Sequence, residues 1–209
     1  MRDLTSGKEG KRILRFALPM LLGNVFHQLY NVVDSVIVGN FIGKEALAAV
    51  GASFPVIFVF YALVLGITSG ATVVIAQYFG AGDQEKVKRT IDTLFIFLFF
   101  ASILISLLGI LFSREIFMLL RLPEEVIPMA ELYLKIFFGG VIASFGFMGT
   151  SAALRGLGDS KTPLYFLIVS TVFNIAFDLL FVVVFDWGIA GVAVASVLAQ
   201  GGAFLTAII

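Results

Sequence analysis

Two aspartates lie within long apolar stretches of the sequence, where a charged side chain is costly to keep. Asp34 and Asp178 are both surrounded by aliphatic and aromatic residues, and Asn174 precedes Asp178 by one helical turn. An ionised side chain at the centre of a membrane helix costs roughly 2.5–3.5 kcal/mol, so such residues usually face water, an ion or each other. Two carboxylates held together away from water cannot both stay charged cheaply, so at least one binds a proton or shares a hard cation. The pair therefore predicts an ion-coupled site.

The composition indicates that these apolar stretches are membrane helices. Of the 209 residues, 60% are hydrophobic and 13% are charged, and the mean hydropathy is +1.06. A soluble domain of this size cannot bury so much apolar surface. A bilayer core about 30 Å thick needs roughly 20 apolar residues per helix. Six spans of that kind are predicted, separated by glycine, proline or charge: residues 13–41, 47–79, 91–112, 126–154, 163–185 and 188–209.

The predicted fold is an all-α integral membrane protein, with residues 1–12 as an N-terminal tail and residues 13–209 as a six-helix transmembrane lobe. Basic residues predict its orientation, because cytoplasmic loops retain lysine and arginine. Ten lie on one side, namely Arg2, Lys8, Lys11, Arg12, Arg15, Lys86, Lys88, Arg89, Arg155 and Lys161. Three, Lys44, Arg114 and Arg121, lie on the other. Both termini are therefore predicted to be cytoplasmic, in a multi-pass protein of the plasma membrane.

Composition also argues against several other kinds of site. The 14 basic and 14 acidic residues cancel, so no overall field points to a nucleic acid partner. The chain has no cysteine and a single histidine, His27, which excludes thiolate metal sites and multi-histidine centres. An intramembrane enzyme is disfavoured for the same reason, because its chemistry needs clustered histidines or a nucleophile beside a base.

Polar residues share one face on three of the predicted helices. On the first span they fall within an arc of about 120°: Asn24, His27, Gln28, Asn31, Asp34 and Ser35. On the fifth, an arc of about 100° holds Ser170, Thr171, Asn174 and Asp178. The sixth carries Ser196 and Gln200 one turn apart. Counted from the outer ends of the spans, Asp34 lies roughly 8–13 Å in and Asp178 and Ser196 each lie about 12 Å in, so we expect the three helices to present these groups at one level.

A second interpretation exists for most of these residues. A single polar side chain in a membrane helix often forms only an interhelical hydrogen bond worth about 1 kcal/mol, and this applies to Ser170, Thr171, Ser196 and Gln200. His27 is explained equally well as a packing residue or as part of a polar cavity. Pro19 removes a backbone donor and predicts a bend in the first helix, either fixed or acting as a hinge.

Four sequence motifs, in order, resemble a known family. They are Asp34-Ser35-Val36-Ile37-Val38-Gly39 on the first span, Gln77 with Gly80-Ala81-Gly82 after the second, Arg155-Gly156-Leu157-Gly158-Asp159 with Pro163, and Asn174 with Asp178. Together they make the whole chain resemble the N-terminal half of the multidrug and toxic compound extrusion (MATE) transporters. The resemblance implies one lobe of a two-lobe, twelve-helix transporter, in which the substrate binds in the cleft between the lobes.

The same resemblance implies roles for individual residues. A coupling cation, H⁺ or Na⁺, would bind at Asp34, Asn174, Asp178 and Ser196, with Na⁺ held by the first three. Gln28 and Tyr30 match cavity positions. The polar face of the first span adds Asn24, His27 and Asn31 to that cavity, and Pro19 matches a proline at which the first helix bends. The implied activity needs no cofactor, and the implied location is a bacterial inner membrane.

The function expected from these features is export of amphipathic or cationic drugs by cation/drug antiport. One alternative is a flippase for lipid-linked sugars, which needs a basic cavity, whereas only Lys135 lies inside a span. Others are a non-transporting membrane subunit or a membrane enzyme. The C-terminal lobe of the family is absent, so we expect either a partial chain, which the abrupt ending favours, or half-length copies that pair.

Overall fold

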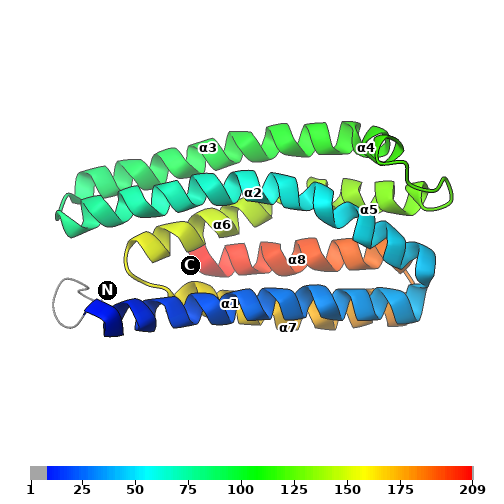
Figure 1. Cartoon of the computed structure of the whole chain (residues 1–209), viewed down its shortest axis with the longest axis horizontal. Coiled ribbons are helices and arrows are strands. Elements are labelled where there is room, and N and C mark those ends of the chain that lie inside the picture. The colour runs from blue at the N-terminus through cyan, green and yellow to red at the C-terminus, as the bar shows by residue number, and fades with distance from the viewer. Residues whose placement is uncertain (1–8, 209) are drawn as a thin grey trace.

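Helices account for nearly all of the described structure, and most of them run side by side along its long axis (Figure 1). The computed structural model describes residues 9–208, apart from the side chains of Glu9, Lys11, Arg12, Arg15 and Ile208. Most of the predicted N-terminal tail, residues 1–8, and Ile209 lie outside the described residues. The elements are α1 Glu9–Ile37, η1 Val38–Ile42, α2 Lys44–Gly80, α3 Gln84–Leu111, α4 Ser113–Leu119, α5 Ile127–Gly139, α6 Val141–Gly156, α7 Lys161–Asp178, η2 Leu179–Val184 and α8 Gly188–Ile208.

Four to five of the described helical segments have the length and apolar character of membrane spans. Among the described residues, four segments are long and apolar enough to cross a membrane: 44–80, 84–119, 161–184 and 188–207. The pair α5 and α6 passes the same test only as one span bent by 51°. Helix α1 has 29 residues, which is ample length, but its polar side chains lower its mean hydropathy. It lies along the same bundle as the other five (Figure 1), so the chain is an all-α, multi-pass membrane protein.

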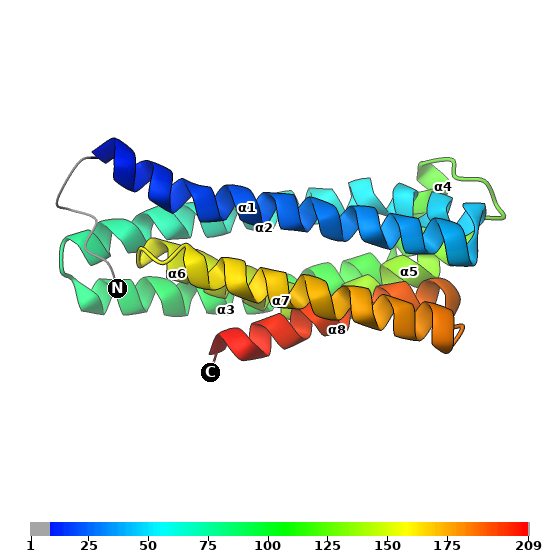
Figure 2. The ribbon, with the colours of Figure 1, turned by 90° about the horizontal axis from the view of Figure 1, so that it is seen from below.

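The helices pack in two groups, which meet where α8 contacts α6. Helix α1 packs on α7, and α7 on α8, whereas α2 packs on α3, α5 and α6. Figure 2 shows α1, α7 and α8 lying beside one another on one face of the bundle. Helix α1 begins and α8 ends toward the same end of the molecule, as an even number of crossings requires.

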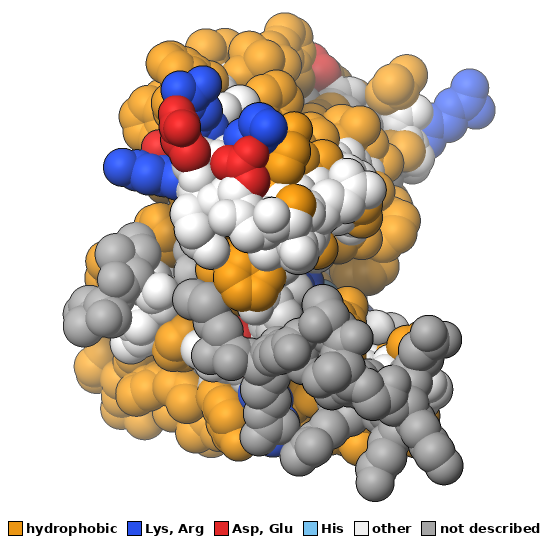
Figure 3. Space-filling model, turned by 90° about the vertical axis from the view of Figure 1, so that its left-hand side faces the viewer, with side chains coloured by type: hydrophobic (Ala, Val, Ile, Leu, Met, Phe, Trp, Pro, Cys, Tyr) orange, Lys and Arg blue, Asp and Glu red, His pale blue; other side chains and the backbone are white. Residues whose placement is uncertain are grey.

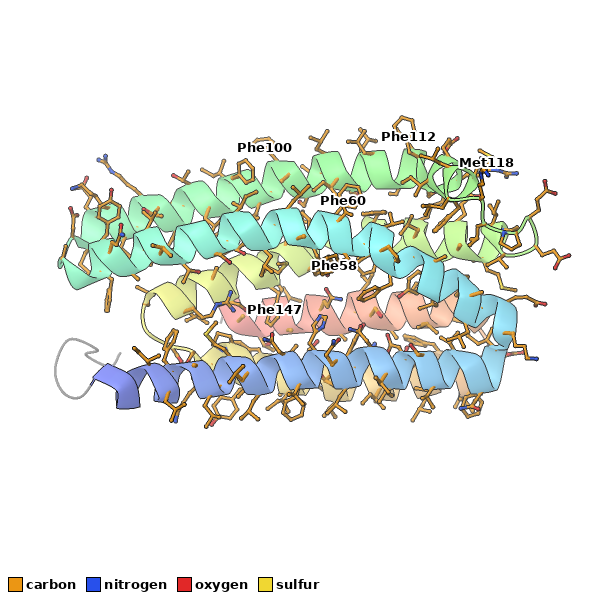
Figure 4. The ribbon with its side chains drawn as sticks, in the orientation of Figure 1. Phe58, Phe60, Phe100, Phe112, Met118 and Phe147 are labelled. Atoms are coloured by element: carbon orange, nitrogen blue, oxygen red, sulfur yellow. The ribbon has the colours of Figure 1, made fainter. Side chains whose placement is uncertain are left out.

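The apolar side chains divide between a packed interior and an outer surface for lipid. Phe138 and Phe145 are fully buried, and Phe60 meets Phe138 edge to face at 5.1 Å between ring centroids. Phe100 of α3 and Phe112, which follows the end of that helix, point away from the bundle (Figure 4) and are 64% and 50% exposed. In water this surface would drive aggregation, so its exposure fits a hydrocarbon solvent.

The link between the third and fourth spans differs from the predicted break at residues 113–125. It contains the short helix α4, which is fixed on the bundle by Phe117, a fully buried side chain. The chain then leaves the helix at Arg121, whose φ of 55° is left-handed. A single buried aromatic residue in seven is too weak a pattern to predict such a helix.

The fourth span bends where two glycines adjoin. Helix α5 ends at Gly139 and α6 begins at Val141, so Gly140 lies at the corner. A Cβ atom at Gly140 would lie 2.3 Å from Cγ1 of Val197 on α8. Close approach of α8 to this corner therefore depends on the missing side chain. The span predicted for residues 126–154 thus contains two helices with a corner between them, because glycine pairs permit a kink that periodicity does not reveal.

Replacing Gly140 with alanine should destabilise the protein by about 1–3 kcal/mol, because Val197 or α8 must move to admit the methyl group. Gly139→Ala is the matched control, since a Cβ at Gly139 meets no heavy atom within 4 Å. Thermal unfolding in detergent, followed by circular dichroism, measures both. Equal melting temperatures for the two variants would show that α8 does not rely on Gly140.

Candidate cation site

Asp34, Asn174 and Asp178 meet between two helices and form what we call the acid–amide group. With its amide oriented to donate, Asn174 Nδ2 lies 2.9 Å from Asp34 Oδ1 and 3.2 Å from Asp178 Oδ2. Asp34 comes from α1, whereas Asn174 and Asp178 occupy successive turns of α7. The spacing of four residues places the amide and carboxyl on one face of α7, and that face packs against α1. One amide thus joins two acids that are distant in sequence.

The three side chains of the acid–amide group are buried in the interior of the bundle. Asp34 is 5% exposed, and Asn174 and Asp178 are both 0% exposed. Oδ1 of Asp178 is buried without a hydrogen-bond partner among the described residues. Both carboxyls accept from the amide of Asn174, which holds the two acids close together. Two buried carboxyls in such proximity are stabilised when one of them is protonated, so the arrangement suits either a shared proton or a cation in its place.

Ser196 attaches the third helix to this site. Tyr30, one turn before Asp34 on α1, donates a hydrogen bond of 2.5 Å from its hydroxyl to Oγ of Ser196 on α8. Ser196 is buried, with 2% of its surface exposed. The structure therefore brings the predicted residues of helices one, five and six together at one level, as the depth of each residue in its span indicates.

Both aspartates lie next to a wide turn of helix. Helix α1 widens into the π-helical segment η1 shortly after Asp34, where the amide of Gly43 donates to the carbonyl of Val38 at 3.1 Å. Helix α7 widens into η2 directly after Asp178, and the two wide turns contact each other. Such turns occur frequently at functional sites, because they add a residue to one turn and displace neighbouring carbonyls. Gly43 closes η1 with a φ of 123°, a conformation that side chains rarely adopt.

Two polar neighbours of the site were not predicted. Tyr133 of α5 is buried within electrostatic range of both Asp34 and Asp178. Tyr133 could not be predicted from the sequence, because a tyrosine in an apolar span is indistinguishable from a packing residue. The second neighbour is a cluster around Gln200, whose side-chain oxygen accepts hydrogen bonds from Ser144 and, at 2.9 Å, from Tyr61.

The residues predicted to line a substrate cavity lie on the less buried side of α1. Asn24, His27 and Gln28 are exposed, whereas Asn31 is half-buried. Asn31 donates to Oε1 of Gln28 at 3.3 Å, and its amide lies 3.4 Å from Nδ1 of His27. Tyr30 is the exception, because its hydroxyl turns inward to Ser196. The polar face of α1 thus divides into an inner part at the acid–amide group and an outer part without cover from this chain.

Pro19 lies inside α1, about one and a half turns before Asn24, the first of these polar residues, and is buried. The helix continues across it, although the proline nitrogen cannot donate to the preceding turn. A weak point in the backbone therefore lies between the start of α1 and the part that carries Asp34.

Long apolar helices packed side by side, with two acids and an amide buried between them, define a polytopic membrane protein. A protein-family model described as MatE matches residues 19–180. That range is most of the 209 residues, and the chain belongs to the MatE family. The resemblance seen in the four sequence motifs is confirmed.

Similarity extends to individual proteins and structures of this family. The chain is 36% identical over 203 residues to the probable multidrug resistance protein YpnP of Bacillus subtilis, covering 97% of this chain and 46% of YpnP. A crystal structure of a MATE protein in a bent conformation matches with a TM-score of 0.90 and 27% identity, over 97% of this chain and 45% of the other. One in a straight conformation gives 0.89 and 27%, over 96% and 44%. The chain thus spans about half the length of these relatives.

Proposed function

We propose that this chain is the cation-binding lobe of a secondary multidrug exporter, which lets H⁺ or Na⁺ enter while it expels amphipathic or cationic drugs. The observation that carries the proposal is the acid–amide group, in which one buried amide bridges two buried carboxyls. The family model and the similar proteins that match this chain belong to a family of transporters, not of enzymes. YpnP is described as a probable multidrug resistance protein, which supports drugs as the exported substrate.

The donor set fits both proposed ions. Carboxylate, amide and hydroxyl oxygens are the ligands that hard cations such as Na⁺ prefer, and Asp34, Asn174, Asp178 and Ser196 supply all three kinds. The free Oδ1 of Asp178 offers a position for a ligand contact. A proton fits the same group, because two adjacent buried carboxyls are stabilised when one is neutral. The same acids would therefore bind either ion, and the gradient available to the cell would decide which is used.

Export requires a route for the drug, which we place along the outer polar face of α1. Asn24, His27, Gln28 and Asn31 would line one wall of a cleft, with Tyr30 at its inner edge. The facing wall would come from a C-terminal lobe or from a second copy of the chain. Ion binding at the acid–amide group would shift α1 about Pro19, and this shift would close the polar wall and release the drug. The similarity to both a bent and a straight structure supports two states of this kind.

The orientation proposed for the lobe places both termini in the cytoplasm of a cell with a bacterial inner membrane. The end of the bundle where α1 begins also carries the α2–α3 turn, with Lys86, Lys88 and Arg89. The opposite end carries Lys44 and Arg114. This distribution matches the orientation rule for basic residues.

A flippase for lipid-linked sugars is supported less well. Apart from Arg15 in the first turn of the first span, Lys135 is the only lysine or arginine inside the predicted spans, and its Nζ lies 2.6 Å from Oε1 of Glu131 on the same helix. Oε2 of Glu131 also lies 4.0 Å from Arg114. This lysine is thus paired with Glu131, and none of the side chains that the structure describes on the polar face of α1 is a lysine or arginine that could hold a pyrophosphate group.

The cation site can be tested on the chain itself, without the second lobe. Adding Na⁺ to the purified protein in weakly buffered detergent solution should release roughly one proton per chain, because the incoming cation replaces the shared proton. The double variant Asp34→Asn with Asp178→Asn should release none. Asp92→Asn, an exposed acid on α3, is the control. If the site binds only protons, Na⁺ has no effect, but on acidification the double variant takes up fewer protons than the wild type. If the wild type, the double variant and the control behave identically in both the Na⁺ titration and the acid titration, the site is contradicted.

A further inference from the structure

A groove runs between α2 and α3 on the outside of the bundle, remote from the acid–amide group. Its volume is about 530 Å³. Its lower part is lined by Ile67 and Ala71 of α2 and by Leu94 and Phe97 of α3. Ile67 and Phe97 are 39% and 49% exposed on the flank of the bundle, whereas Leu94 is buried and forms the floor of the groove.

One end of the groove, near the α2–α3 turn, is lined by basic side chains. Lys86 and Arg89, one turn apart on α3, line it together with Tyr78 of α2 and Thr90. Nζ of Lys86 lies 5.4 Å from the ring centroid of Tyr78, so the ammonium group is drawn over the groove by a cation–π contact. Figure 3 shows charged side chains gathered at this end of the molecule, with hydrophobic side chains around them.

Both basic side chains have acidic neighbours, but these neighbours lie outside the groove. Lys86 Nζ is 2.9 Å from Asp83 Oδ2, and Arg89 Nη2 is 2.6 Å from Glu85 Oε1. The side chains of Arg89 and Glu85 are 77% and 75% exposed, so this ion pair is weak and exchangeable. A phosphate group that enters the groove would therefore compete for Arg89 on favourable terms.

The length of the groove matches half of a bilayer. From Lys86 to Phe97 the helix rises by about 16 Å, at about 1.5 Å per residue. Half of a hydrocarbon core that is about 30 Å thick is about 15 Å. A molecule with a charged end at Lys86 and a hydrocarbon chain reaching Phe97 would thus have its charged end at the membrane surface and its chain in the hydrocarbon core.

We propose that this groove binds an anionic phospholipid, with its phosphate at Lys86 and Arg89 and one acyl chain along Ile67, Ala71, Leu94 and Phe97. A free phosphate would leave the apolar part uncovered, and a cationic drug would find no carboxylate among the side chains that line the groove. The site does not depend on cation coupling, so it stands or falls separately from the proposed transport function.

Native mass spectrometry of the detergent-solubilised protein tests the proposal with phosphatidylglycerol and phosphatidylcholine of equal chain length. The wild type should bind phosphatidylglycerol about tenfold more tightly, which is the order expected from two basic side chains at a membrane surface. The double variant Lys86→Gln with Arg89→Gln should lose this preference. Lys44→Gln with Lys88→Gln removes the same charge outside the groove and should keep it. Glu85→Gln should strengthen phosphatidylglycerol binding, because it frees Arg89.

Two further measurements separate a lipid from its headgroup alone. Ala71→Leu fills the apolar part and should weaken phosphatidylglycerol binding severalfold, whereas a tenfold excess of inorganic phosphate over lipid should displace little of it. Displacement by phosphate together with an unchanged Ala71→Leu variant would mean a simple phosphate site and would overturn the proposal. Equal binding of the two lipids to the wild type, or equal loss in the two double variants, would overturn it as well.

Discussion

Replacing Asp178 with asparagine is expected to abolish ion-driven drug export while making the folded protein more stable. Asparagine nearly matches aspartate in shape but can neither take up a proton nor balance a cation, so the acid–amide group loses its exchange chemistry. The stability should rise by about 1–3 kcal/mol, because the buried and unpartnered Oδ1 of Asp178 no longer belongs to an ionisable group. A variant that fails to transport only because it is damaged would instead melt earlier.

Efflux of a fluorescent lipophilic cation from cells that contain the assembled transporter measures the first effect, and thermal unfolding measures the second. The rate should fall to that of cells without the protein, and it should no longer respond to dissipation of the ion gradient. Asp92→Asn should behave like the wild type. Unchanged, gradient-dependent efflux in the Asp178→Asn variant would exclude this residue from coupling.

Pro19→Ala is expected to slow drug export roughly tenfold, since motion of a gating element would limit the cycle, and to leave cation binding intact. Alanine restores the backbone donor and removes the clash that weakens the helix at this position. The isolated propensity difference is about 3 kcal/mol in favour of alanine, so the variant should be at least as stable as the wild type. Slower transport by a more stable protein would identify Pro19 as a hinge.

The control for this experiment is Pro55→Ala. Pro55 also lies inside a long helix, α2, but it is exposed, and α2 supplies none of the acid–amide group. Its replacement should change stability in the same direction without a comparable loss of transport. If Pro19→Ala exports drug at the wild-type rate, Pro19 does not act as a hinge and the ion must act by another route.

Most of the fold follows from the sequence because lipid imposes a simple rule. Each crossing needs a long apolar helix whose backbone groups are paired internally, so length and punctuation determine the spans. The corner at Gly140 is different in kind. It depends on contact with Val197, which is far away in the chain, and no local pattern contains that information. Helix α4 was missed because a short helix at the membrane surface has neither the length nor the periodicity of a span.

The core of the site was predictable for a related reason. Acids are so costly in hydrocarbon that Asp34 and Asp178 had to meet something polar, and their depths in the spans limited the choice. Hydroxyl groups carry no such cost, so the sequence could not reveal that Tyr133 lies near the acids or that Tyr61 and Ser144 share Gln200. The functional roles of all these residues remain proposals for the experiments above.

The shared amide has a consequence for how an ion would leave. A carboxamide carries two N–H donors on one side and a lone-pair oxygen on the other. In the arrangement described here, the donors of Asn174 face both acids. A half-turn about its last side-chain bond would present the oxygen to a cation instead. The same side chain would then stabilise the empty and the filled state in turn, which would lower the barrier to release and keep the affinity moderate, as a carrier requires.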